Sequence, residues 1–351
     1  MIQPIAIGNK KLGGQEKPFI IAEMSGNHNQ SLERAFAIIH AAADAGVDAI
    51  KLQTYTADTI TFKGSGDEFF VKDQNSLWKN QSLHDLYKQA YTPWEWHKPI
   101  FDYANELGLI AFSSPFDETA VDFLETLNVP VYKIASFENT DHILLKKVAQ
   151  TGKPVIMSTG VATIADIQES IKVLEDNGCG QLVLLKCTST YPASPENTNI
   201  LTIPHMRDLY QYPIGLSDHT MGIGVSVASV AFGACVIEKH LTLSRAEGGV
   251  DAAFSLEPAE FKSLVIETER AFAGLGKVTY ALSDKEKKSL QFKRSLYLVK
   301  NIKAGEAITA EHVRSIRPAN GLHTKYYEAI IGKTMKADAT AGTPLRFELF
   351  E

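Results

Sequence analysis

The sequence of 351 residues has only three cysteines, and it contains no CxxC motif. Cys179, Cys187 and Cys235 cannot all pair with one another, which fits a protein of a reducing compartment. We interpret them as small residues of the core.

A run of about 18 apolar residues, long enough to cross a membrane, is also absent, and the first residues, MIQPIAIGNKK, lack the apolar segment of a secretory signal. We therefore expect a soluble, cytoplasmic protein.

The chain has no block of basic residues, and its formal net charge is −6. These features argue against nucleic acid or an anionic membrane as a main partner. An anionic substrate would instead need a local cluster of cations. We therefore look for lysines at positions where several segments converge.

Short apolar runs rich in β-branched residues alternate with helical patterns from residue 18 to about residue 275, which is typical of repeated βα units. We predict eight strands, at residues 18–24, 49–55, 109–114, 131–136, 154–159, 182–188, 213–219 and 235–241. An open doubly wound sheet would normally carry a GxGxxG turn after its first strand, but the sequence there reads AEMSGNHNQ. The pattern therefore predicts an α/β protein with a (β/α)8 TIM barrel.

Two segments depart from this rhythm. Residues 56–92, between the second strand and its helix, are longer than an ordinary βα loop. Their mixture of aromatic and polar residues predicts either a loop or short helices that line the mouth of a site, or a packed surface excursion. We place the barrel domain at residues 1–276, a charged linker at 277–290 and a small second domain at 291–351. That domain is near the lower size limit for folding alone, so we expect it to dock against its own barrel or a partner subunit.

Two histidines occupy equivalent places in consecutive predicted strands: His219 ends PIGLSDH and His240 lies near the end of CVIEKHL. In a parallel sheet these strand ends point the same way, so the two imidazoles are expected to lie side by side. Histidine is the commonest metal ligand, and we favour a divalent metal site completed by water, a carboxylate or substrate oxygen. The alternative is two histidines bonded to neighbouring backbone or carboxyl groups.

The carboxyl ends of barrel strands form the active site of this fold, and here they carry further polar residues. Lys51 and Gln53 share one face of the second strand, and Lys133 lies in the fourth. A lysine in a strand interior seldom stays unpaired, because burial of the ammonium is costly. The lysines are expected to hold a phosphate or carboxylate, with nearby hydroxyls completing the cradle. The alternative for each is an ion pair with Glu23 or Glu138.

The sequence pattern alone does not assign a function to three acidic residues. Glu23 follows an apolar run, where a buried carboxylate can accept a proton, although a salt bridge to Lys51 explains it nearly as well. Glu138 and Asp251 follow the fourth and eighth strands and are within reach of polar substrate groups. Since surface acids are common, a structural role is the simpler interpretation of these two.

Along the barrel region the sequence reads, in order, IIAEMSGNHNQSLERA, KLQTY, FSSPF, YKIAS, STG, CTSTYPA, GLSDHT and IEKHLTL. This series resembles the sialic acid synthase family of phosphoenolpyruvate-dependent nonulosonate synthases. The C-terminal segment with RSLY and IRPANGLH is similar to the antifreeze-like, or SAF, domain of that family. The resemblance covers essentially the whole chain and implies a TIM barrel followed by a SAF domain.

The resemblance also implies roles for individual residues. His219 and His240 match metal ligands, usually for manganese, with magnesium or cobalt as alternatives, and Glu23 matches the acid proposed for proton transfer. The groups that hold phosphoenolpyruvate match Lys51, Ser114, Lys133, Ser136 and Ser158. Ser189 stands where the sialic acid enzymes carry an asparagine in their phosphate-binding string, and its hydroxyl can still donate. Sugar contacts match Gln53, Tyr191, Glu138, Asp251 and Arg317.

Arg317 in IRPANG matches an arginine that the SAF domain of one subunit extends into the barrel of the other, which implies a homodimer. Within the family, SLWKNQSLHDLYKQAYTPWEWH and LKCTSTYPA look most like the pseudaminic acid synthases. That branch condenses phosphoenolpyruvate with 2,4-diacetamido-2,4,6-trideoxy-L-altrose and releases phosphate. The alternatives are an N-acetylneuraminate, legionaminate or spore-coat sugar synthase and, more distantly, a metal-dependent or Schiff-base aldolase. A carbohydrate-binding protein would leave the His, Lys and Glu cluster without a role.

Overall fold

The computed structural model describes residues 2–73 and 76–351, and the chain divides into two compact units, residues 1–276 and 277–351. The predicted linker at residues 277–290 falls in the second unit, where Asp284–Ser289 forms helix α11. The exact domain limits stay a prediction. Within the described residues, no helix is both long enough and apolar enough to cross a membrane.

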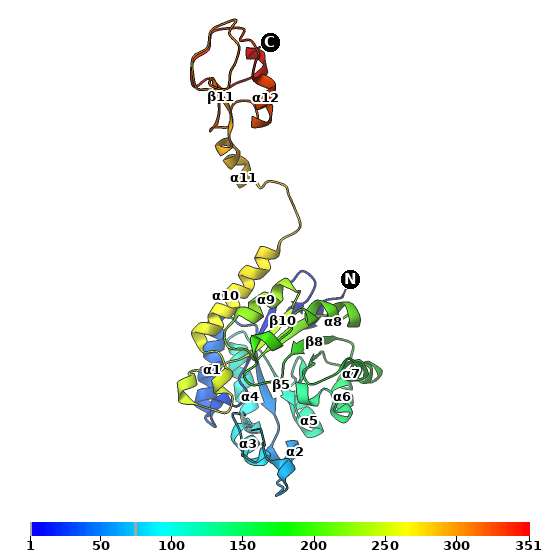
Figure 1. The fold of residues 1–351 in the computed structure, drawn as a ribbon. Helices are drawn as coiled ribbons and strands as arrows, with labels where there is room; N and C mark the ends of the chain where they lie inside the picture. The colour runs from blue at the N-terminus through cyan, green and yellow to red at the C-terminus, as the bar shows by residue number, and fades with distance from the viewer. Residues whose placement is uncertain (1, 74–75) are drawn as a thin grey trace. The chain divides into compact units, whose positions relative to one another are not determined.

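The first unit contains a closed barrel of eight parallel strands (Figure 1). The strands are β3 (Phe19–Glu23), β4 (Ala49–Thr54), β5 (Ile110–Pro115), β6 (Tyr132–Ile134), β7 (Val155–Ser158), β8 (Leu182–Cys187), β9 (Ile214–Asp218) and β10 (Val236–His240). Each strand pairs with its neighbour in sequence, and β10 pairs with β3 to close the ring. Every one of them overlaps a predicted strand, and the predicted TIM-barrel class is confirmed.

Helices alternate with the strands and cover the outside of the barrel (Figure 1). They are α1 (Leu32–Ala45), α4 (Trp94–Glu106), α5 (Glu118–Thr126), α6 (His142–Ala149), α7 (Ile164–Asp176), α8 (Thr202–Tyr210), α9 (Gly224–Ala231) and α10 (Pro258–Leu275). Local sequence sets their ends. Ser31 caps α1 by accepting the backbone N–H of Arg34, and the helix stops at Gly46, whose φ of 84° suits glycine.

Side chains that point into the barrel change character along the strands. The amino-terminal half of the interior is an apolar cluster that includes Phe19, Ile21, Phe112, Ile156 and Val183. A strand alternates its faces with a period of two, so the next inward-facing side chain lies two residues further along each strand. At that second level the inward side chains are polar. Those polar positions are Glu23, Lys51, Ser114, Lys133, Ser158, Ser217 and Glu238. The barrel therefore has an apolar base and a charged upper layer.

A hairpin that the strand prediction did not include packs at the base. Strands β1 (Ile5–Ile7) and β2 (Lys10–Leu12) pair antiparallel. Ile5, Ile7 and Leu12 are buried in the same cluster as the first inward residues of the barrel strands. The hairpin thus plugs the amino-terminal end of the barrel.

Within the described residues, the insertion at 56–92 contains helices α2 (Ala57–Ile60) and α3 (Leu83–Ala90) and one 3-10 turn at Asp67–Phe69. Gln74 and Asn75, inside this insertion, lie outside the described residues. Trp78 donates its indole N–H to the carbonyl of Val250, 3.0 Å away, and its ring lies 5.9 Å from the ring of Tyr191. The insertion therefore reaches the loop after β10 and lines the carboxyl end of the barrel.

The second unit is built from short strands around a small core. Strands β11 (Ser295–Leu298) and β12 (Val313–Ile316) pair antiparallel, and helix α12 (Tyr327–Ile330) follows. Isolated bridges, such as Ile302 with Ala339, tie the remaining loops together. Its core is a separate apolar cluster that consists of Leu296, Leu298, Ile302, Ile308, Val313, Ile330, Met335, Leu345 and Phe350.

Candidate active site

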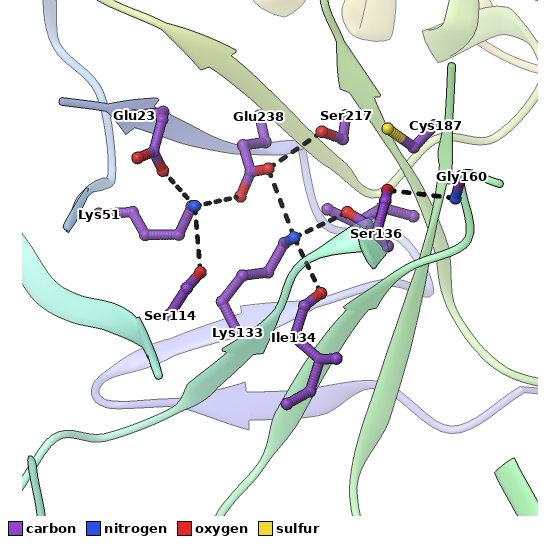
Figure 2. Close-up of polar contacts among 12 residues, drawn as sticks. Glu23, Lys51, Ser114, Lys133, Ile134, Ser136, Gly160, Cys187, Ser217 and Glu238 are labelled. Carbon is purple, nitrogen blue, oxygen red and sulfur yellow. Dashed lines mark hydrogen bonds and ion pairs between the residues drawn. The ribbon is translucent and has the colours of Figure 1, made fainter. Parts of the chain in front are cut away.

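Two lysines and two glutamates meet inside the upper layer of the barrel (Figure 2). Lys51 on β4 forms an ion pair with Glu23 on β3, and its Nζ lies 3.7 Å from Glu238 Oε2. Lys133 on β6 lies 3.6 Å from the other oxygen of Glu238. Glu238, from β10, therefore stands between two ammonium groups that come from strands on other sides of the barrel.

Serine hydroxyls complete the contacts of this network. Lys51 Nζ donates to Ser114 Oγ at 3.3 Å, and Lys133 Nζ donates to Ser158 Oγ at 2.7 Å. Ser217 Oγ donates to Glu238 Oε1 at 3.0 Å. The predicted alternative for the lysines, an ion pair with a carboxylate, is realised through Glu23 and Glu238, while Glu138 forms no such pair among the described residues.

Burial and neighbouring charge set the protonation of this group. Burial raises the pKa of Glu23 to about 7, although Lys51 opposes the shift. Burial also acts on the pKa of Glu238 in the raising direction, but Lys133 and Lys51 outweigh it and hold that pKa below its ordinary value. Burial lowers the pKa of Lys133. Glu23 is thus the carboxyl group of the network best suited to exchange a proton near neutral pH.

A second polar cradle lies where β7 ends. The backbone N–H of Gly160 donates to Ser136 Oγ at 3.2 Å, and a Cβ at this position would clash with the hydroxyls of Ser136 and Ser189. Asn139 holds the same loop by donating to the carbonyls of Ser158 and Gly160, at 3.2 and 3.0 Å. The absence of a side chain on Gly160 leaves room for two hydroxyl groups, and the Gly160 N–H orients the Ser136 hydroxyl, which keeps its own proton to donate to an anion.

The predicted histidine pair lies close together. The ring centroids of His219 and His240 are 5.3 Å apart. His219 Nδ1 lies 3.1 Å from the carbonyl of Thr188, so this nitrogen carries a proton and Nε2 is the nitrogen that would bind a ligand. His240 Nδ1 is buried and has no hydrogen-bond partner among the described residues. Each ring therefore has a nitrogen available to a ligand.

These features fit a divalent cation held by two imidazoles. Burial lowers the pKa of His240 well below its ordinary value and keeps that ring neutral. Burial acts on His219 in the same direction, but the nearby Cys187 sulfur raises its pKa overall, so metal binding there would release a proton. No group of three or more His, Cys, Asp or Glu side chains is arranged to hold a metal in the described part of the chain. Other positions would then belong to water or substrate.

Four of the residues predicted to contact a sugar, Gln53, Glu138, Tyr191 and Asp251, belong to the barrel unit. The ring of Tyr191 lies 4.5 Å from that of His219. Asp251 is buried and accepts a hydrogen bond from Ser25 Oγ. Glu138 Oε2 is buried and has no hydrogen-bond partner within the part of the chain that the structure describes, and burial raises the pKa of Glu138 to about 7. Gln53 is half-buried on the inward face of β4, beside Ser114 in the strand register.

Arg317 is an exposed residue of the second unit, and the structure describes it only within that unit.

The site residues that the motifs did not identify are Glu238, Ser217 and Gly160. For Glu238 a signal existed, because it shares a strand face with His240. For Gly160 the signal was only its place in STG, and the clash that a Cβ would cause is a three-dimensional fact.

Comparisons with known proteins agree on one family. The model of the NeuB family matches residues 38–280, and that of the SAF domain matches residues 293–351. The chain is 42% identical to a pseudaminic acid synthase of Campylobacter jejuni over 340 residues, which is 97% of this chain and 98% of that protein. It is 40% identical to a pseudaminic acid synthase of Helicobacter pylori over 331 residues, 94% of this chain and 97% of the relative.

A solved structure agrees as well. The crystal structure of an N-acetylneuraminic acid synthetase from Leptospira borgpetersenii, in complex with citrate, superposes with a TM-score of 0.72 at 32% identity. The match covers 83% of this chain and 96% of that one. Both the barrel and the small C-terminal domain therefore have counterparts among known proteins.

Proposed function

The chain belongs to the NeuB family, and we propose that it is a pseudaminic acid synthase. The reaction joins phosphoenolpyruvate to 2,4-diacetamido-2,4,6-trideoxy-L-altrose and releases phosphate. The observation that carries the proposal is the pair of buried lysines, from β4 and β6, that converge beside two histidines at one barrel mouth. Full-length similarity to two pseudaminic acid synthases supports the choice of sugar.

Lys51 and Lys133 would bind the anionic groups of phosphoenolpyruvate, and the hydroxyls of Ser114 and Ser158 fix the two ammonium groups in place. The hydroxyls of Ser136 and Ser189 would hold the phosphate from the other side, with the Ser136 hydroxyl oriented by the backbone N–H of Gly160. These donors are positioned by the fold before the substrate arrives, so little reorganisation is needed during the reaction.

The carbon–carbon bond forms when C3 of phosphoenolpyruvate attacks the aldehyde carbon of the open-chain sugar. His219 and His240 would hold the divalent ion, manganese in this proposal, that polarises the aldehyde oxygen. Water then adds to C2, and the tetrahedral product loses phosphate as the C–O bond breaks. Glu23, with a pKa raised by burial to about 7, would accept the proton of that water.

Sugar contacts would come from Gln53, Glu138, Tyr191 and Asp251, which border the mouth. Arg317 would reach the barrel of a second subunit, so that the homodimer completes each site. An arginine fork suits a planar or anionic group, and its arrival would exclude water. The support for this arrangement is the match to the SAF domain and the exposed position of Arg317 in its unit.

Phosphate release from phosphoenolpyruvate, measured with manganese and the trideoxy sugar, N-acetylmannosamine or a legionaminate precursor, tests the proposal. We expect turnover with the trideoxy sugar only, lost on chelation. Turnover with N-acetylmannosamine would place the chain among sialic acid synthases, and turnover with a legionaminate precursor would place it in that branch. No release with any aldose would refute a condensing enzyme. Borohydride trapping of Lys51 or Lys133 would indicate a Schiff-base aldolase instead.

A further inference from the structure

A second ion pair lies directly behind the histidine pair. Lys239 Nζ and Asp218 Oδ2 are 2.9 Å apart, and the side chains are 1% and 0% exposed. Lys239 precedes His240, and Asp218 precedes His219. Because strand residues alternate between faces, this pair points away from the barrel interior. There Ser226 on α9 donates to Asp218 Oδ2 at 2.6 Å.

The backbone ladder between β9 and β10 ends at this pair. The register joins Leu216 with Ile237, Ser217 with Glu238, and Asp218 with Lys239. His219 lies one residue beyond the last joined position. The separation of the two imidazoles is therefore not set by a ladder pair between the residues that carry them.

The Lys239 ammonium provides the missing connection. It donates to the carbonyl of Thr220 at 2.6 Å, and the backbone N–H of Thr220 donates to Asp218 Oδ1 at 2.9 Å. These contacts bracket His219 on both sides. One side chain from the strand of His240 thus ties the turn that carries His219 to that strand, while the backbone N–H of Ala193 donates to the carbonyl of His219 from the loop after β8.

We propose that Lys239 is a positioning residue that sets the distance between His219 and His240 for metal binding. The inference rests on the proposed function, because it concerns the same divalent ion. Stability alone is a weak reason for such a pair, since apolar residues often replace buried ion pairs without loss. The bonds to Thr220 give the pair a geometric role that an apolar contact would not supply.

The test is the manganese affinity of Lys239→Met, measured by electron paramagnetic resonance of free Mn²⁺ well below the unfolding temperature. We expect affinity to fall roughly 10–100-fold, as for other groups that orient metal ligands. The matched control is Lys10→Met, which removes the 2.9 Å ion pair with the largely buried Asp48 next to the base of the barrel. It should change manganese affinity less than about twofold, because it loses a lysine–aspartate pair far from the histidines.

Ser226→Ala is the second variant, because Lys239→Met leaves a buried aspartate unpaired and can prevent folding. It removes one hydrogen bond to Asp218 and should weaken manganese binding by about fivefold. If the wild type binds manganese and the folded variants bind it with the same affinity, the inference is overturned and the proposed function is left intact. Absence of binding by the wild type refutes the metal site and the inference together, while phosphate release tests the condensation separately.

Discussion

Replacement of Glu238 by glutamine tests the central charge network. The carboxylate lies 3.7 and 3.6 Å from the Nζ atoms of Lys51 and Lys133. Each contact has a gross attraction of about 4 kcal/mol at an effective dielectric constant near 20, and desolvation of the carboxylate cancels much of it. Loss of one partner from a buried pair costs about 3–5 kcal/mol. Lys51 keeps Glu23, so we expect about 3 kcal/mol and a melting temperature lower by roughly 6–12 °C.

The same variant should respond more strongly to phosphoenolpyruvate. Under the proposed function, phosphoenolpyruvate would compete in the wild type with the Glu238 carboxylate for the two ammonium groups. In Glu238→Gln that competition is gone, and an anion restores the missing charge. If the substrate binds tenfold more tightly, its stabilising effect grows by about 1.4 kcal/mol, or roughly 3 °C of additional shift.

Thermal unfolding with and without phosphoenolpyruvate, in the absence of metal, measures both effects. Glu125→Gln is the control, because Glu125 pairs with Lys153 at 2.7 Å on the outside of the barrel. It should change neither the melting temperature by more than about 2 °C nor the shift caused by the substrate. If phosphoenolpyruvate raises the melting temperature of Glu238→Gln no more than that of the wild type, the substrate does not compete with Glu238. Glu238 would then be only a structural partner of the lysines.

Further outcomes follow from other parts of the molecule. Lys51→Met should raise KM for phosphoenolpyruvate roughly 10–100-fold through loss of a charge-assisted contact, whereas Lys153→Met should not; equal KM values would contradict the binding role. Burial lowers the pKa of His28 and His97 to about 4, so both bind protons more readily when unfolded. The free energy of unfolding should fall by about 3 kcal/mol for each as pH drops from 6.5 to 4, and urea titrations of His97→Gln should show a shallower decline. Ile7→Ala should cost about 2–5 kcal/mol in the same assay; a smaller loss would mean that the hairpin does not plug the barrel.

Much of the barrel was predictable because its signals are local. A strand such as PIGLSDH shows its apolar run, its bounding turns and its alternation within seven residues. The position of His219 relative to His240 follows from the parallel arrangement of adjacent strands, and the two rings do lie 5.3 Å apart. Lys51 and Glu23 are also neighbours in register, so their ion pair was among the expected alternatives.

Interactions across the barrel were not predictable in the same way. Glu238 contacts Lys51 and Lys133, whose strands are not adjacent to its own, and the reach across the ring depends on barrel closure and strand stagger. The hairpin of β1 and β2 escaped detection because its strands have three residues each and are stabilised by the barrel base they cover. No pattern in a single sequence indicates the stereochemistry of the sugar that a site accepts.

The hairpin at the base also bears on how ligands reach the site. The apolar side chains below the charged layer already fill the barrel interior, and Ile5, Ile7 and Leu12 of the hairpin pack against the same cluster. In the described part of the barrel, the carboxyl end is then the only side from which the polar layer can be reached. Under the proposed function, both substrates would enter and both products would leave through that one opening, an arrangement that favours an ordered kinetic sequence in which the deeper substrate binds first.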